Sequence, residues 1–178
     1  MSVHLREAWH HVAVDTVTLF HGTNRGAFDQ ILRDGEFKKS NPEAVAHEVE
    51  RRYGLPYNSV WMHKYNEFSR GRASDPHIYF TNNKAIAREY AELGSEVVFD
   101  ALNCVIHILK WDELVDDDGN YRPGAAEKRK GWIAEETRKH YSPVVLTVEI
   151  PTEIAGYGFD TTHIPGPLPA SWIVGVDR

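Results

Sequence analysis

Strand-like and helix-like segments do not alternate regularly along this chain, and their order constrains the fold more than any other feature. Runs rich in β-branched and aromatic residues, which are typical of strands, cover residues 17–20, 77–81, 144–150 and 172–176. Helical periodicity fills the intervals between them in unequal blocks. A regular alternation would favour a Rossmann-type parallel sheet. The sequence therefore predicts an α+β fold with a split antiparallel sheet flanked by helices.

Capping residues mark where the first helices begin and end. Asn24 is expected to cap a helix that Gly35 closes, and Asn41, followed by Pro42, is expected to cap a second helix that Gly54 ends. A third helix is predicted to start after Asn82 or Asn83. Two more are predicted over residues 96–114 and about 125–140. The first strand is predicted to stop at the tripeptide of residues 21–23.

The remaining segments are predicted to be less regular. Residues 55–76 form a long loop, and its aromatic side chains either serve a function or fill the core. Residues 157–163 are compatible with a strand. Pro165, Pro167 and Pro169 make a stiff link before the last strand.

Size and composition limit the class of protein. A length of 178 residues favours one domain, 1–178, and the 42% hydrophobic and 26% charged residues are ordinary for a globular protein. The apolar runs fall short of the ~20 residues that a membrane helix needs. Residues 1–11 lack the apolar core of a signal peptide. We therefore expect a cytoplasmic protein without membrane association.

Charge and cysteine content exclude further classes. The formal net charge of −6 argues against broad nucleic-acid binding, since phosphate backbones attract basic surfaces. The single cysteine, Cys104, excludes an intramolecular disulfide and a multi-cysteine metal site, and we expect it to be buried and inert. The ten histidines show no metal-ligand spacing, so no metal site is predicted.

The tripeptide His21-Gly22-Thr23 is the first candidate for chemistry. A histidine at a strand end exposes its imidazole, and the glycine after it allows a ligand to approach the backbone closely. A bare backbone N–H and C=O together suit a flat primary amide, which needs one acceptor and one donor. The alternative is an ordinary strand-to-helix turn.

A second pattern, Ile78-Tyr79-Phe80-Thr81 followed by Ala87 and Tyr90, completes a resemblance. The two patterns together resemble the His-Tyr-Glu branch of the ADP-ribosyltransferase superfamily, which includes poly(ADP-ribose) polymerases, diphtheria-type toxins and rifamycin ADP-ribosyltransferases. The resemblance covers residues 17–35 and 77–93, and the C-terminal strands loosely. It implies an ADP-ribosyltransferase-like fold, with NAD as co-substrate.

The resemblance also implies roles for individual residues. His21 resembles the histidine that hydrogen-bonds a ribose hydroxyl of NAD, and Gly22 resembles the glycine whose backbone pairs with the nicotinamide carboxamide. Thr23 completes this cofactor-binding motif. Tyr79 and Tyr90 resemble the tyrosines that line and stack on the nicotinamide ring. Such stacking contributes about 0.5–2 kcal/mol.

The family's third position, a catalytic glutamate, has no direct match in this chain. Asp160 is the first candidate for this role, because an aspartate takes it in the rifamycin-modifying relatives. Glu149 is the second candidate and Glu153 the third. The alternative is that Asp160 is a solvated residue at a strand end. Arg25 lies close to the first motif, and is either a contact for the NAD pyrophosphate or an exposed helix residue.

The resemblance implies transfer of one ADP-ribose from NAD with release of nicotinamide. The acceptor is a protein side chain, a nucleic acid or a small molecule, with nucleic acid disfavoured by the acidic charge. Two other functions stay open. One is an RNA 2′-phosphotransferase, which shares the His-Gly-Thr start but needs several arginines around a phosphate. The other is a non-catalytic module that binds NAD or ADP-ribose, which the missing glutamate favours.

Overall fold

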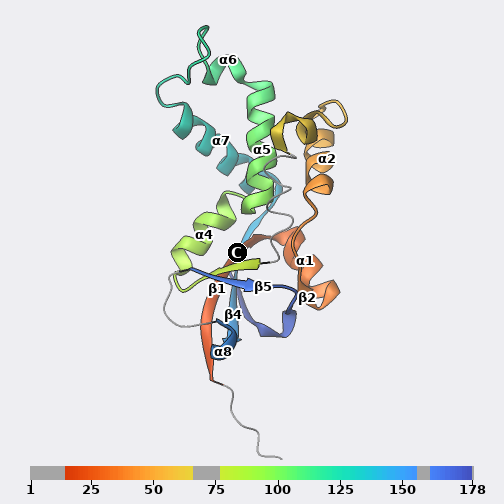
Figure 1. Cartoon of the computed structure of the whole chain (residues 1–178), viewed down its shortest axis with the longest axis vertical. Helices are drawn as coiled ribbons and strands as arrows, with labels where there is room; N and C mark the ends of the chain where they lie inside the picture. The colour runs from red at the N-terminus through yellow and green to blue at the C-terminus, as the bar shows by residue number, and fades with distance from the viewer. Residues whose placement is uncertain (1–14, 66–76, 156–160, 178) are drawn as a thin grey trace, which may run out of the picture.

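An antiparallel sheet of five strands organises one end of the molecule (Figure 1). The computed structural model describes residues 15–65, 77–155 and 161–177. Within them the strands lie in the order β5-β3-β1-β4-β7, and a two-stranded sheet pairs β2 with β6. The strands are β1 (Thr16–Asn24), β2 (Glu36–Phe37), β3 (His77–Thr81), β4 (Pro143–Pro151), β5 (Thr161–Pro165), β6 (Leu168–Pro169) and β7 (Ile173–Asp177). The α+β class with a helix-flanked antiparallel sheet is thus confirmed.

Helices form the rest of the described chain. They are α1 (Arg25–Asp34), α2 (Pro42–Tyr53), the π-helical turn η1 (Trp61–Tyr65), α4 (Lys84–Glu92), α5 (Ser95–Leu109), α6 (Trp111–Leu114), α7 (Ala125–His140), α8 (Thr152–Ala155) and the 3-10 turn η2 (Ala170–Trp172). None of the helices in the described ranges is long and apolar enough to cross a membrane.

The predicted helix caps are confirmed. Each cap depends only on neighbouring residues, so the sequence is enough to predict it. The side chain of Asn24 accepts a hydrogen bond from the Ala27 N–H, and Asn41 caps α2 in the same manner. Asn83, one of the two candidates, caps α4. Gly35 and Gly54 close their helices at φ values of 74° and 64°, in the left-handed region that favours glycine.

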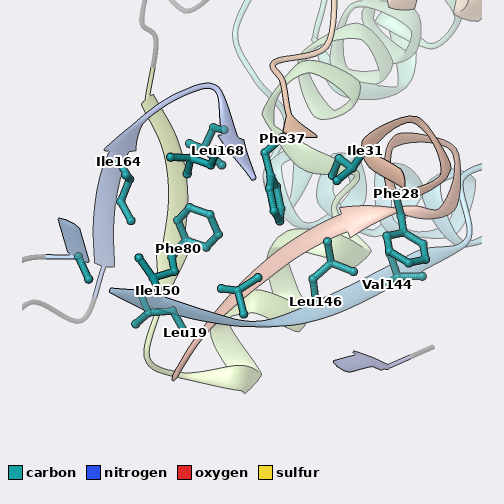
Figure 2. Close-up of a cluster of buried hydrophobic side chains, with 13 residues drawn as sticks. Leu19, Phe28, Ile31, Phe37, Phe80, Val144, Leu146, Ile150, Ile164 and Leu168 are labelled. Carbon is teal, nitrogen blue, oxygen red and sulfur yellow. The ribbon is translucent and has the colours of Figure 1, made fainter. Parts of the chain in front are cut away.

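The two faces of the sheet pack against different partners. Even-numbered residues of β1 face α4, where Phe20 packs against Ala87, Ala91 and Val145. Odd-numbered residues face the opposite side, where they join a larger sheet core (Figure 2). Figure 2 shows this core filled by side chains from β1, β3, β4, β5, β6, α1 and β2; its labelled members are Leu19, Phe28, Ile31, Phe37, Phe80, Val144, Leu146, Ile150, Ile164 and Leu168.

A separate helical core lies at the other end of the molecule, where α2, α5 and α7 gather (Figure 1). Its buried members are Ala46, Val49, Val60, Val98, Ala101, Leu102, Cys104, Val105, Ile133 and Tyr141. Cys104 is buried there as predicted, and burial raises the pKa of its thiol to about 12.

A buried carboxylate ties the segment after α2 to this helical core. Glu50 accepts hydrogen bonds from the backbone N–H groups of Asn58 at 3.0 Å, Val60 at 2.9 Å and Trp61 at 3.2 Å. Its other partner is the His47 Nδ1, at 2.9 Å. Burial alone would raise the pKa of Glu50, but these four hydrogen bonds lower it below its ordinary value.

The predicted long loop of residues 55–76 is therefore only partly a loop. It contains the helical turn η1, and residues 66–76 lie outside the described chain. Its aromatic residues differ in their packing. Trp61 packs against the helical core, whereas Tyr57 is exposed and stacks on His47 with ring centroids 4.4 Å apart.

Two sequence predictions on element boundaries were wrong. β1 runs through His21-Gly22-Thr23 to Asn24 and does not stop at His21, because β4 pairs with it over its whole length. The helix predicted over residues 96–114 is two helices, α5 and α6, separated at Lys110. This break lets Leu114 turn back and pack near Ile106.

Two further differences concern the C-terminal region. The proline-rich link contains β6, which pairs Leu168 with Phe37 and Pro169 with Glu36. The sequence allowed a strand over residues 157–163, and the structure has the strand β5 at Thr161–Pro165, beside β3. Residues 156–160 lie outside the described chain. The last strand is present as β7, with Trp172 in the turn before it.

Candidate functional site

The backbone of Gly22 faces the gap between β1 and β3. Just after the end of β1, the backbone N–H of Arg25 donates to the carbonyl of Ser142, the residue before β4, at 3.0 Å. The backbone of Arg25 therefore points toward the β4 side of the sheet. Backbone direction alternates along a strand, and Gly22 is paired in register with Val145. The N–H and C=O of Gly22 therefore point away from β4, toward β3.

Strand β3 does not close this gap. Between β1 and β3, the described residues show one register pair, Phe20 with Thr81. On the other side of β1, by contrast, the register with β4 continues from Thr16 to Asn24. The sheet is thus open on the β3 side of Gly22. A ligand with one donor and one acceptor can pair with a strand edge exposed in this way.

Gly22 also lies directly under α4. A Cβ atom added there would sit 2.0 Å from the Ala87 carbonyl oxygen and 2.9 Å from the Ala91 nitrogen. Both are backbone atoms, which cannot rotate away as a side chain would. The glycine is therefore needed for the packing of α4 on β1, and this packing brings Tyr90 of α4 close to the open edge.

The imidazole of His21 links the two strands that border the gap. Its Nδ1 lies 2.8 Å from the Tyr79 carbonyl oxygen. A carbonyl only accepts, so Nδ1 carries the hydrogen and donates. Burial lowers the pKa of His21, which the hydrogen bond to Tyr79 offsets in part. A neutral ring with its hydrogen on Nδ1 leaves Nε2 as an acceptor.

Aromatic packing holds the His21 ring in this position. The ring of Phe37 contacts it edge-on with centroids 5.7 Å apart, and the ring of Phe80 lies at 5.4 Å. Phe37 and Phe80 belong to the sheet core and also contact each other (Figure 2). The imidazole is thus fixed by the core on one side and by Tyr79 on the other.

A cavity of about 200 Å³ lies at this gap; we call it the first cavity. Five of the six predicted cofactor-binding residues line it: His21, Gly22, Thr23, Tyr79 and Tyr90. The exposed fractions of the Tyr79 and Tyr90 side chains, 38% and 58%, leave both rings accessible for stacking. The structure therefore brings together two motifs that lie about sixty residues apart in the sequence.

The sixth predicted residue, Arg25, lies elsewhere. It lines a neighbouring second cavity of about 750 Å³ between α1, the start of α2 and the end of α7. Its Nε forms an ion pair with Asp29 Oδ1 at 3.0 Å, and its guanidinium lies over the Phe28 ring. Arg25 is therefore adjacent to the first cavity and does not line it, and its guanidinium is already paired with the carboxylate of Asp29.

Of the three predicted catalytic acids, the two that the structure describes do not line the first cavity. Asp160, the first candidate, lies outside the described residues. Glu149 is an exposed residue of β4 that pairs with Thr18, and Glu153 is an exposed residue of α8. Neither Glu149 nor Glu153 lines the cavity.

The acidic residue among the described cavity-lining residues is Glu96, in the first turn of α5. Sequence reasoning missed it, because nothing local places the start of α5 beside β1. Thr161, the first residue of β5, also lines the cavity and is paired in register with Thr81. Within the described ranges, no group of three or more metal-ligating side chains is found.

Comparisons with known protein families, with curated proteins and with solved structures found no match to this chain.

Proposed function

We propose that this protein is a mono-ADP-ribosyltransferase with an ADP-ribosyltransferase-like fold, which uses NAD as its co-substrate and releases nicotinamide. The observation that carries the proposal is the meeting of His21, Gly22, Tyr79 and Tyr90 around one cavity, where β1 and β3 separate. Each of these residues offers a contact that the nicotinamide end of NAD needs.

The first step is recognition of the nicotinamide group. The outward-facing C=O and N–H of Gly22 match the NH₂ donor and the carbonyl acceptor of the carboxamide. The rings of Tyr79 and Tyr90 offer faces for a flat, positively charged pyridinium, which gains both packing and cation–π attraction. The unprotonated Nε2 of His21 accepts a hydrogen bond from a ribose hydroxyl.

The chemical step breaks the bond between the ribose C1′ and the nicotinamide nitrogen. Nicotinamide leaves as a neutral molecule with the bonding electron pair, and the ribose passes through an oxocarbenium-like state. A nucleophile of the acceptor then bonds to C1′ and loses its proton. Fixed negative charge near C1′ lowers the barrier, as a carboxylate does in glycoside hydrolysis. Asp160 stays the first candidate for this charge.

One observation favours a second function, which is binding of NAD or ADP-ribose without transfer. The strand residue that borders the first cavity from β5 is Thr161, which carries no charge. If neither Asp160 nor Glu96 places a carboxylate near C1′, a cavity with Gly22, His21 and the two tyrosines would bind the dinucleotide and leave it intact.

The RNA 2′-phosphotransferase gains no such support. Such an enzyme needs several arginines around a phosphate, and the described residues that line the first cavity include none.

Release of nicotinamide tests the proposal directly. The purified protein is incubated with NAD, free nicotinamide is quantified by chromatography, and candidate acceptors are examined by mass spectrometry for the addition of one ADP-ribose. A transferase releases nicotinamide in proportion to the modified acceptor. Binding of NAD without any release, for every class of acceptor, would favour the binding module.

Three charge-removing variants then identify the acid. Asp160→Asn is expected to lower turnover on the order of 100–1,000-fold while NAD affinity is retained, because the charge acts in the transition state. Glu149→Gln serves as the control and should remain active, since its side chain lies away from the cavity. If Glu96→Gln is the inactive variant, the acid comes from α5.

A further inference from the structure

The helical end of the molecule, opposite the sheet, carries two large aromatic side chains on its surface (Figure 1). The exposed fraction of Trp111, the first residue of α6, is 49%, and that of Tyr121, in the turn after α6, is 61%. The small core next to them contains neither; its buried members are Ile106, Leu114, Val115 and Ala125. Exposed aromatic side chains gathered in one place commonly mark an interaction surface.

A histidine joins the two aromatic residues into one continuous patch. The centroid of the His107 ring, in α5, lies 6.1 Å from that of Trp111 and 6.1 Å from that of Tyr121. Its Nδ1 donates to the Asn103 carbonyl oxygen at 2.6 Å, and its Nε2 accepts from the Tyr121 hydroxyl at 3.0 Å. The exposed His63 of η1 extends the patch, with its ring centroid 6.4 Å from that of His107. We call these four residues the aromatic patch. The hydrogen bonds hold its central ring in place, which reduces the entropy that binding would cost.

The surroundings of the aromatic patch are acidic. Residues 112–118 contain five carboxylates. Glu113 forms ion pairs with Lys110 Nζ at 3.2 Å and with Lys128 Nζ at 2.6 Å. Arg122 is nearby, but its Nε donates to two backbone carbonyls. In the part of the chain that the structure describes, the other four carboxylates have no ion-pair partner; they belong to Asp112, Asp116, Asp117 and Asp118.

The charge and the aromatic rings together select the kind of partner. A basic surface would supply the cations that these aspartates lack, and an apolar side chain on it would cover Trp111 and Tyr121. Nucleic acids and anionic membranes carry the same sign of charge as the aspartates, which repel them. A twofold contact with a second copy would set the same aspartates opposite one another.

We propose that the aromatic patch, with the aspartates of residues 112–118, docks a basic segment of another protein, which places an apolar side chain against Trp111 and Tyr121. The patch lies at the C-terminal end of α5, whereas the first turn of α5 lines the first cavity. This inference therefore does not rest on the proposed use of NAD.

Binding of three synthetic peptides tests the docking site. The first is a short amphipathic helical peptide of leucine and lysine. In the second peptide glutamate replaces every lysine, and in the third alanine replaces every leucine. Fluorescence anisotropy of the labelled peptides measures binding to the wild type, to Trp111→Ala and to a double variant with Asp117→Asn and Asp118→Asn. The matched controls, at exposed residues outside the patch, are Leu32→Ala and a double variant with Glu43→Gln and Glu135→Gln.

We expect the leucine–lysine peptide to bind the wild type and both controls with equal affinity, and the other two peptides to bind more weakly. Trp111→Ala should weaken the leucine–lysine peptide at least about 10-fold, as the loss of an aromatic hot spot does. The double aspartate variant should weaken it several-fold and reduce the salt dependence of its affinity. Asp117 and Asp118 are exposed turn residues, so this variant tests the charge even if Trp111→Ala lowers the melting temperature.

Several results would overturn the proposal. Equal binding of the glutamate peptide would mean that the charge plays no part, and equal binding of the alanine peptide would mean that the rings play none. A wild type that does not bind the leucine–lysine peptide, or unchanged affinity in the patch variants, would remove the docking site. Sedimentation without peptide tests the remaining occupant, since a wild-type dimer that Trp111→Ala dissociates would assign the patch to a second copy.

Discussion

Replacement of Gly22 by alanine tests how α4 lies on β1, the packing that shapes the first cavity. The added Cβ would meet the Ala87 carbonyl oxygen at 2.0 Å, whereas ordinary van der Waals contact begins at 3.4 Å. The neighbouring atoms are backbone, so α4 must move as a unit. Overpacking of this kind typically costs about 1–3 kcal/mol, and we expect the upper end of that range for Gly22→Ala.

Thermal unfolding followed by circular dichroism measures this cost. For a chain of this size, a loss of about 3 kcal/mol lowers the melting temperature by roughly 6–12 °C. Gly131→Ala is the matched control, because Gly131 lies in α7 with no atom within 4 Å of an added Cβ. Alanine in an exposed helix position should raise stability by about 0.5–1 kcal/mol.

The two variants should therefore shift the melting temperature in opposite directions. A Gly22→Ala protein with the same melting temperature as the wild type would refute the close approach of α4 to β1. Loss of NAD binding at unchanged stability would also contradict the packing argument, since it would mean that the methyl group blocks the ligand and leaves the helix in place.

The other predictions concern stacking, the buried thiol and the buried carboxylate. Tyr90→Ala should weaken NAD binding about 5- to 150-fold in calorimetry, since stacking on an aromatic ring is worth roughly 1–3 kcal/mol; Tyr90→Phe should keep the wild-type affinity. Cys104, with its pKa raised by burial to about 12, should resist iodoacetamide at pH 8 until the protein is unfolded. Glu50→Gln should destabilise the protein by at least about 2 kcal/mol in urea unfolding. Because the pKa of Glu50 is lowered below 4.5 in the folded state, its contribution is present above pH 4.5 and is lost as the pH falls below that value, so the wild type should lose more stability on acidification than Glu50→Gln.

Each of these predictions has an outcome that contradicts it. A Tyr90→Ala protein with lower stability but normal NAD affinity would make Tyr90 a packing residue. Rapid labelling of Cys104 in the native protein would mean that α5 does not bury it. An equal loss of stability on acidification in the wild type and Glu50→Gln would mean that the ionised carboxylate of Glu50 does not anchor residues 58–61.

Local features of the fold could be predicted from the sequence, because neighbouring residues determine them. Asn24, Asn41 and Asn83 cap helices through their own side chains, and Gly35 and Gly54 end helices through their own backbone conformations. Features that depend on distant partners were missed. β1 continues through His21-Gly22-Thr23 because β4, more than a hundred residues away in the sequence, pairs with it.

The same distinction holds for the candidate site. His21, Gly22, Tyr79 and Tyr90 belong to compact motifs and were predicted together. Glu96 carries no local signal of function, because only the packing of α5 near β1 places it at the first cavity. Sequence proximity suggested Arg25 for the pyrophosphate, but the helix directs it to the second cavity, beside Asp29.

Calorimetric titration of NAD into the wild type and into His21→Ala tests the central claim most directly. His21 joins β1 to β3 through Tyr79 and lines the first cavity, so its removal takes away one ligand contact and the strand-to-strand hydrogen bond. The account predicts saturable binding of NAD by the wild type and an affinity weakened by about tenfold or more in a folded His21→Ala protein. Equal NAD affinity in the two proteins, or no binding by the wild type, would contradict it.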